Sequence, residues 1–257
     1  MSERVERFAV EGTPSLAVRA ASGDVRVVDG SAGEVVVRLR GRDHIVESFL
    51  IEQHGNTITI EPERGRSVSG PVGIVVEVGE PAVLRVRIAS GDVTAETELA
   101  ELGVDTASGD VRAGRIRDGA QAKSASGDLQ FGEIGGGLSV ASASGDVVAA
   151  AVGRNLEAKV ASGDIRIGRI GGDVDVKSAA GDLDIESFEG GDLSAKTLSG
   201  NVTVGVVSGR RFSVSFNSLS GHIRTDFPVT DGGGGGAPSR LNVKTMSGNI
   251  RIRPAGG

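Results

Sequence analysis

A short phrase, Ser-Gly-Asp followed by an aliphatic residue, recurs through the chain at a constant spacing. It starts at Ser90 and returns every 18 residues, at Ser108, Ser126, Ser144 and Ser162, with a variant that starts at Ala180. Asn or His replaces Asp in three later copies, which start at Ser199, Ser220 and Ser247 after steps of 19, 21 and 27 residues. A short constant period is typical of repeats that stack on one another and not of an ordinary globule that is rich in glycine.

Apolar residues follow the phrase at every second position, which is the pattern of a half-buried strand. The position directly after the Asp, Asn or His holds Val93, Val111, Leu129, Val147, Ile165, Leu183, Val202, Ile223 and Ile250. A second alternating apolar run occupies the other half of each repeat, and an isolated repeat could not bury its inner face. The sequence therefore predicts an all-β fold, a parallel β-solenoid (β-helix) with about 18 residues per coil. The crossover rule favours a right-handed winding.

The remaining segments interrupt this regular pattern. Residues 1–88 contain short β-branched runs and one copy of the phrase, Ser22–Val25, so we expect an irregular β-rich N-terminal cap that can include a first coil. Residues 89–257 are predicted to form the regular solenoid. The one helical candidate is short, His44–Gln53. The segment 228–239 contains five consecutive glycines and is predicted to be a flexible loop.

Composition narrows the functions that the chain can have. Seven Phe and no Trp or Tyr leave few rings for a carbohydrate platform or for base stacking. The net charge of −6 argues against nucleic acid, and we expect no nucleic-acid partner.

We expect Phe188, Phe212 and Phe216 to be enclosed where the repeat spacing lengthens.

The sequence also suggests a compartment. There is no cysteine, which excludes disulfides and thiolate metal sites. Neither a secretion signal nor an apolar run of about 18 residues is visible, so we expect no membrane span and a cytoplasmic location. A cell-surface location reached by a non-classical route is the alternative. No cofactor is predicted.

The aspartates of the phrase form the sharpest candidate site: Asp92, Asp110, Asp128, Asp146, Asp164 and Asp182. Stacked about 5 Å apart, such carboxylates would repel by about 1 kcal/mol per pair in water. Bound calcium could offset this repulsion, because rows of Asp on glycine turns present oxygen ligands. The structural alternative is an Asx-type turn in which each carboxylate accepts a backbone N–H. Asn201 and Asn249 keep that bond without the charge and favour the structural alternative.

Arg112 and Arg166 lie two residues after an aspartate and share its outward face, so we expect each to form a surface ion pair with it. Together with Arg26 and Arg224, these arginines are expected to offset the repulsion along the carboxylate column.

Lysines form a second outward column, on the other half of the repeat. Its members are Lys123, Lys159, Lys177, Lys196 and Lys244, and it is interrupted by Ala141 and Ser215. The column could contact an anionic polymer or lipid surface, or it could keep a flat face soluble. The three histidines, His44, His54 and His222, lack the spacing of metal ligands, and no nucleophile, base and orienting residue can be assembled, so no metal site and no catalytic residue are predicted.

The Ser-Gly-Asp-Val repeat, the segment Val75–Ile88 and the segment Leu50–Ile60 together resemble the putative adhesin family of bacterial β-strand-repeat domains of unknown function. The resemblance covers about residues 8–253. It implies a β-helical fold and brings no catalytic residues with it.

Three functional hypotheses follow. The first is a non-enzymatic scaffold or protein-interaction module that binds an unknown protein or a second copy, for which the uncovered end near Arg251–Pro254 is a candidate surface. The second is a carbohydrate-binding or carbohydrate-active solenoid. The third is a calcium-stabilised cell-surface adhesin.

Overall fold

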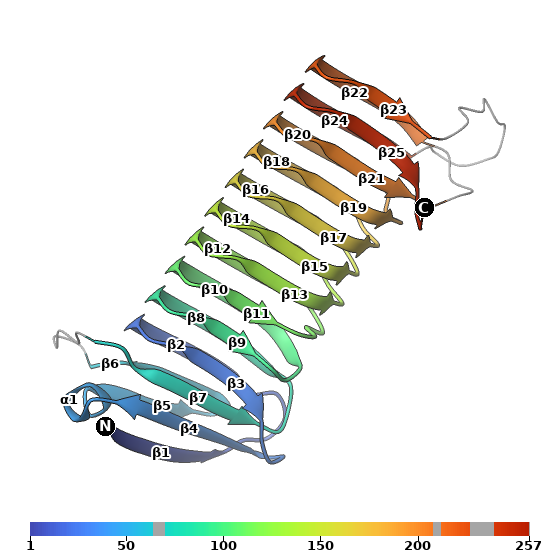
Figure 1. Cartoon of the computed structure of the whole chain (residues 1–257). Helices are drawn as coiled ribbons and strands as arrows, with labels where there is room; N and C mark the ends of the chain where they lie inside the picture. Colours follow the sequence, from blue (N-terminus) through green and yellow to red (C-terminus); the bar gives the residue numbers. More distant parts are fainter. Residues whose placement is uncertain (64–69, 208–211, 227–238, 257) are drawn as a thin grey trace. The chain divides into compact units, whose positions relative to one another are not determined.

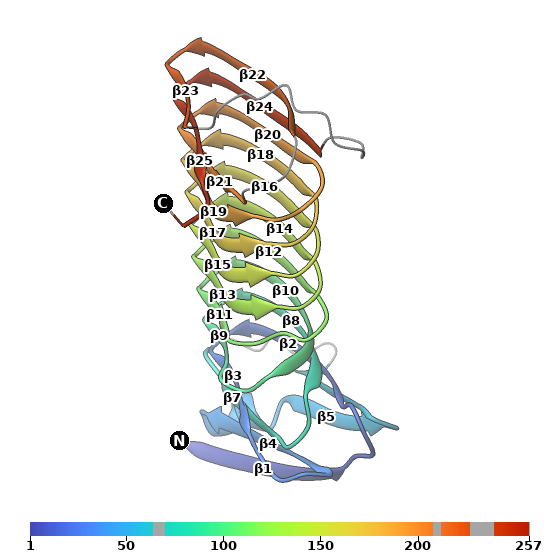
Figure 2. The ribbon, with the colours of Figure 1, turned by 90° about the vertical axis from the view of Figure 1, so that its right-hand side faces the viewer.

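The computed structural model describes residues 1–63, 70–207, 212–226 and 239–256. Strands dominate this part of the chain, and it contains no helix long and apolar enough to cross a membrane. The chain divides into two compact units, residues 1–132 and residues 133–257. Within each unit, parallel strands lie side by side (Figure 1, Figure 2). The fold is therefore all-β with long parallel sheets, as predicted.

The first unit begins with strands that do not follow the repeat. These are β1 (Ser2–Ala9), β4 (Glu34–Gly41), β5 (Phe49–His54), β6 (Thr57–Pro62) and β7 (Gly73–Val78). β4 pairs antiparallel with β1 and with β7, and β5 pairs antiparallel with β6. The helix predicted at His44–Gln53 is wrong over most of its length, since α1 spans only Asp43–Val46. Phe49 and Ile51 are both buried in β5, and this alternation is that of a strand.

The repeats of the first unit form strand pairs, by which we mean two strands joined at a Ser-Gly-Asp corner, one in each of two sheets. The strands are β2 (Ser15–Ser22) and β3 (Val25–Asp29), β8 (Ala82–Ser90) and β9 (Val93–Ala95), β10 (Leu99–Ser108) and β11 (Val111–Ala113), β12 (Ala120–Ser126) and β13 (Leu129–Ile134). Equivalent residues align in parallel register, so that Val111 lies beside Val93 and Leu129. The early copy of the phrase joins this array, because Val25 also lies beside Val93.

The second unit repeats the same arrangement. Its strands are β14 (Leu138–Ser144) and β15 (Val147–Val152), β16 (Leu156–Ser162) and β17 (Ile165–Ile170), β18 (Val174–Ala180) and β19 (Leu183–Phe188), β20 (Leu193–Ser199) and β21 (Val202–Val206), β22 (Phe212–Ser220) and β23 (Ile223–Thr225), β24 (Ser239–Ser247) and β25 (Ile250–Pro254). Ile165 lies beside Val147 and Leu183, a step of 18 residues in each direction.

The last two strand pairs stack in the reverse of their sequence order. β24 lies between β20 and β22, and β25 lies between β21 and β23 (Figure 1). The outermost strand pair of this unit is therefore β22/β23. The hypothesis of an uncovered end near Arg251–Pro254 is wrong for Arg251 and Ile252, which are paired with both β21 and β23, whereas Arg253 and Pro254 are paired with β21. The predicted loop at 228–239 lies outside the described residues apart from Ser239, which begins β24.

The predicted apolar columns form the core of both units. In the column after the corner, every member is at most 4% exposed except Ile223, which is 46% exposed on the outermost strand pair. Phe188 is fully buried, as expected. Phe212 and Phe216 are only half-buried, which corrects the expectation for both, because among the described residues their strand β22 has a neighbour on one side only.

Two constraints require glycine at each corner. The corner glycines have φ between +119° and +154°, a region that side chains with a Cβ rarely adopt. The corners also approach each other so closely that a Cβ on Gly109 would lie 2.1 Å from the carbonyl oxygen of Gly91. Any larger residue at this position must move the backbone of the neighbouring strand pair.

We therefore expect Gly109→Ala to destabilise the protein by at least about 2 kcal/mol, because backbone strain and a backbone clash add. Gly114→Ala is the matched control, since its Cβ would meet no atom within 4 Å and its φ is not in the positive region. That control should leave stability unchanged or raise it by up to about 1 kcal/mol. Urea unfolding measures both, and equal destabilisation by the two substitutions would contradict the account.

Candidate functional site

The predicted aspartate column lies at the corners and joins neighbouring strand pairs. In the first unit, Asp92 Oδ1 accepts a hydrogen bond from the backbone N–H of Asp110 at 2.9 Å. In the second, Asp164 Oδ1 accepts one from the N–H of Asp182, also at 2.9 Å. The same bond is made by Asp24, Asp110, Asp146 and Asp182. The acceptor is an Asp side-chain oxygen, as predicted for an Asx-type turn. The donor, however, is a backbone N–H of the next strand pair and not of the same turn. We call this row of bonds the corner ladder.

The corner ladder continues through the two asparagines and ends at His222. Asn201 Oδ1 accepts the N–H of Asn249 at 3.0 Å, and Asn249 Oδ1 accepts the N–H of His222 at 2.9 Å. Histidine carries no side-chain oxygen that could continue the row. A neutral imidazole could accept through Nδ1, but the last corner needs no acceptor, so a histidine is tolerated there, which agrees with the outermost position of β22/β23.

Arginines offset part of the charge along the corner ladder. Arg112 forms an ion pair with Asp110 at 2.7 Å, and Arg166 forms ion pairs with both Asp146 and Asp164. The pKa of Asp110 is lowered, first by the bond from the Asp128 N–H and then by Arg112, while desolvation opposes the shift. The expectation for the other two arginines is wrong, because Arg26 pairs with Glu96 and Arg224 with Asp226.

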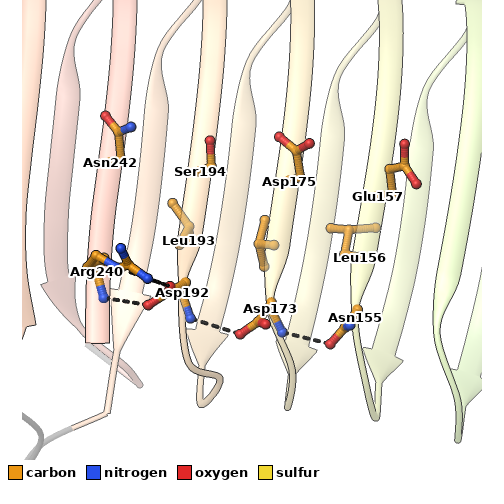
Figure 3. Close-up of a pocket in the computed structure, with 11 residues that line it drawn as sticks. Asn155, Leu156, Glu157, Asp173, Asp175, Asp192, Leu193, Ser194, Arg240 and Asn242 are labelled. Atoms are coloured by element: carbon orange, nitrogen blue, oxygen red, sulfur yellow. Dashed lines mark hydrogen bonds and ion pairs between the residues drawn. The ribbon is translucent and has the colours of Figure 1, made fainter. Parts of the chain in front are cut away.

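A second ladder, which the sequence analysis missed, runs along another corner of the second unit (Figure 3). Asn155 Oδ1 accepts the N–H of Asp173 at 3.0 Å, Asp173 Oδ1 accepts the N–H of Asp192 at 2.9 Å, and Asp192 Oδ1 accepts the N–H of Arg240 at 2.9 Å. We call it the Asn155 ladder. Its sequence signal is an Asn or Asp directly before the buried Leu156, Val174 and Leu193.

A shallow depression of about 570 Å³ lies beside the Asn155 ladder (Figure 3). Its rim includes the four carboxylates of Glu157, Asp173, Asp175 and Asp192 and the guanidinium of Arg240. Each carboxylate already has a partner: Lys159 for Glu157, Lys177 for Asp175, and backbone N–H groups for the two aspartates of the ladder. Arg240 also pairs with Asp192 through its side chain, and the pKa of Asp192 is lowered by both contacts, the backbone bond first.

The lysine column is exposed and is split between the units. Lys123 lies on β12 of the first unit, and Lys159, Lys177, Lys196 and Lys244 lie beside one another on β16, β18, β20 and β24 of the second. Lys159 and Lys177 pair with carboxylates of their own strands at 2.7 and 3.2 Å. The corresponding residues before Lys196 and Lys244 are Ser194 and Asn242, which carry no charge. Asn217, and not Ser215, follows Lys244 in the column.

An exposed apolar row, also missed from sequence, lies beside the last of these lysines. Leu198, Met246 and Leu219 are neighbours on β20, β24 and β22 and are 55%, 52% and 75% exposed. Earlier strands of the unit carry the small residues Ala161 and Ala179 at this position. The change from small to large residues was the available signal. We call Lys196, Lys244, Leu198, Met246 and Leu219 the docking patch.

Metal ligation finds little support in the geometry. No group of three or more His, Asp or Glu side chains that could hold a metal ion occurs in the described ranges. The corner aspartates direct Oδ1 at a backbone N–H, so that oxygen already has a donor.

The hydrogen bonds of the corner ladder require a side-chain oxygen acceptor at each corner more than they require a negative charge. Substitutions of Asp164 test this. We expect Asp164→Ala to destabilise the protein by about 1–2 kcal/mol, because the N–H of Asp182 loses its acceptor. Asp164→Asn keeps the acceptor and should cost clearly less. Thermal unfolding with and without a chelator measures both variants, and equal losses, or a chelator effect on the wild type, would contradict the structural role.

The Asn155 ladder predicts a dependence on pH. The pKa of Asp192 is lower in the folded state than in the unfolded chain, so the ionised carboxylate stabilises the fold above the unfolded value of about 3.9. This contribution is lost as the pH falls through the folded pKa. Asp192→Asn should therefore be less stable than the wild type at pH 7, and the difference should shrink by pH 2–3. Urea unfolding at both pH values tests this, and a constant difference would contradict it.

Comparison with known proteins places the chain in a family. The model described as Toastrack DUF4097 matches it twice, over residues 4–133 and 117–253. No curated protein matches the chain.

Several solved structures are similar at low identity. A putative lipid binding protein from Parabacteroides distasonis ATCC 8503 has a TM-score of 0.49 at 13% identity, with 96% of each chain covered. A putative adhesin from Bacteroides fragilis NCTC 9343 has a TM-score of 0.42 at 13% identity, with 98% of this chain and 97% of that chain covered. A putative adhesin from Parabacteroides distasonis also has a TM-score of 0.42 at 13% identity, with 97% of each chain covered. Such distant likenesses assign no function. The family model, by contrast, accounts for most of the sequence, and the chain belongs to the Toastrack DUF4097 family.

Proposed function

We propose that this protein is a right-handed parallel β-solenoid of about 18 residues per coil that acts as a non-enzymatic scaffold and binds a protein partner at the docking patch. The observation that carries the proposal is the exposed apolar row beside two lysines that have no carboxylate on their own strands. Three large apolar side chains are more than half exposed there, on adjacent strands.

The chemistry of the patch indicates the kind of partner. Leu198, Met246 and Leu219 lose contact with water when an apolar surface covers them, which favours binding. Lys196 and Lys244 lie two residues before Leu198 and Met246 on the same outward faces. Their ammonium groups fit a partner with acidic side chains around an apolar centre, and they would make association sensitive to salt.

The state of the carboxylates supports a scaffold over an enzyme. General acid and base catalysis requires a carboxyl group that can reach a substrate. The aspartates of the two ladders use Oδ1 to hold backbone N–H groups of the next strand pair. A change in their protonation would therefore act on the stack itself.

A carbohydrate-binding role is the second candidate, and the depression beside the Asn155 ladder favours it. Its rim of carboxylates, Arg240 and Asn242 is polar, as sugar recognition requires. We rank it second because each of the four carboxylates already has a partner. The third hypothesis, a calcium-stabilised adhesin, has only the aspartate column in its favour.

Capture from a lysate of the native cell, followed by titration with the purified partner, tests the proposed function. We compare the wild type with a variant that carries Leu198→Ser and Met246→Ser. A matched control carries Ala161→Ser and Ala179→Ser, which lie in the same outward column of neighbouring strands. All four positions are exposed, so each change should alter stability by less than about 0.5 kcal/mol.

The proposal predicts a protein that the wild type and the control both bind and the patch variant binds at least tenfold more weakly. Replacing Lys196 and Lys244 with Gln should weaken binding further and reduce its salt dependence. Equal affinity across all variants would contradict the proposal. Binding or cleavage of a purified glycan that Asp175→Asn abolishes would favour the carbohydrate alternative instead.

A further inference from the structure

The outermost strand pair of the second unit ends in an open strand edge. Among the described residues, β22 pairs with β24 on one side and with no strand on the other. A strand paired on one side leaves every second N–H and C=O group directed away from the sheet. These groups are a template for one further strand.

The side chains above this edge belong to the core columns. Val214 and Ile223 lie beside Leu241 and Ile250, which are 2% and 1% exposed, yet they are themselves 50% and 46% exposed. Phe216 lies beside Val243, which is fully buried, and is half-buried itself. The apolar core therefore opens to solvent at this end.

β22 differs from the other edge strands, β1, β5 and β23, in carrying no charged residue. All nine residues of Phe212–Ser220 are uncharged. The neighbouring strands β20 and β24 each carry a lysine, and β1, the outer strand of the first unit, carries Glu3, Arg4, Glu6 and Arg7. Charged residues on an edge strand normally prevent pairing with another chain. β22 lacks this protection.

The end of the corner ladder restricts how a further strand can be added. Another Ser-Gly-Asp corner stacked on β22/β23 would need a hydrogen-bond acceptor at the position of His222, and histidine offers one only through a deprotonated Nδ1, not the permanent oxygen that Asp and Asn provide. Continued stacking of the same kind is therefore less favourable there than at the Asp and Asn corners. Pairing along β22 alone does not need that acceptor.

We propose that β22 pairs antiparallel with β22 of a second copy of this chain, with Phe216 opposite Phe216. Phe216 is the midpoint of Phe212–Ser220, so all nine residues overlap. Residues that face each other in an antiparallel pair have side chains on the same face. Val214 is then opposite Ser218 of the second copy, and the core-facing sides of the two strands adjoin. A twofold pairing of this kind uses the edge of both copies and closes as a dimer.

This inference goes beyond the proposed function, because it uses the edge of β22 and its core-facing side chains. Leu219 of the docking patch points to the opposite, outward face of the same strand. The two proposals can therefore fail separately.

Light scattering and sedimentation equilibrium across a concentration series test the dimer. The wild type should have twice the 26.1 kDa mass of one chain. Val214→Lys places a charge on the core-facing side of the edge and should give a monomer that still unfolds cooperatively, at a melting temperature that no longer depends on protein concentration. Ser213→Lys is the matched control, since it adds the same charge to the outward face of the same strand and should remain a dimer.

Cysteine cross-linking tests the register, because the chain has no cysteine of its own. Phe216→Cys should form a covalent dimer with a short bis-maleimide, since the two residues face each other about 5 Å apart. Ser213→Cys should not, because its twin lies six residues along the pair, about 20 Å away.

Two results would overturn the proposal. The first is a wild type that stays monomeric at every concentration, whether or not a variant without residues 228–236 dimerises. The second is a dimer that Val214→Lys leaves intact, which would indicate another interface.

Discussion

The structure depends on one hydrogen bond, from the backbone N–H that follows the corner glycine to the side-chain oxygen at the same corner of the preceding strand pair. The bond requires the two corners to approach so closely that no Cβ fits between them, and this explains the glycine at each corner. It also requires an oxygen at the next position, which Asp and Asn both provide. One contact thus explains the glycine and the Asp or Asn of the recurring phrase. The aliphatic residue that completes the phrase begins the next strand and is buried in the core.

Much of the strand register and of the core could be predicted from the sequence, because each repeat is packed against copies of itself. The constant step aligned Val93 with Val111 and Ile165 with Leu183, and those columns are buried as expected. The reversed order of the last two strand pairs was not predicted, since sequence order alone suggests sequential stacking. His222 carried the signal, because the last corner of the ladder donates its backbone N–H and needs no side-chain oxygen of its own. The Asn155 ladder was missed because only three residues define it. The apolar row was missed because large residues replace the small ones before the corner only at Leu198, Leu219 and Met246. The phenylalanines of β22 were expected in the interior because the repeat spacing lengthens there, but the spacing does not show whether a neighbouring strand covers them.

The corner hydrogen bond distinguishes the side chains that maintain the fold from those that remain available to bind a partner. Carboxylates at the corners and along the Asn155 ladder hold neighbouring strand pairs together, so their charge is largely offset by N–H groups and arginines. The outward-facing side chains between the corners do not join strand pairs. They vary from small to large along each row, and their charges vary from paired to unpaired. Recognition by this Toastrack DUF4097 protein is therefore best sought on those rows and at the open edge of β22.

Amide hydrogen exchange at the corners tests the central claim most directly. The N–H groups of Asp110, Asp164 and Asp182 donate to side-chain oxygens and not to backbone carbonyls. They should exchange as slowly as the strand amides beside them, and Asp164→Ala should accelerate exchange at Asp182 while Asp164→Asn should not. Exchange at Asp182 as fast as in an unstructured peptide, or unaffected by Asp164→Ala, would contradict the account.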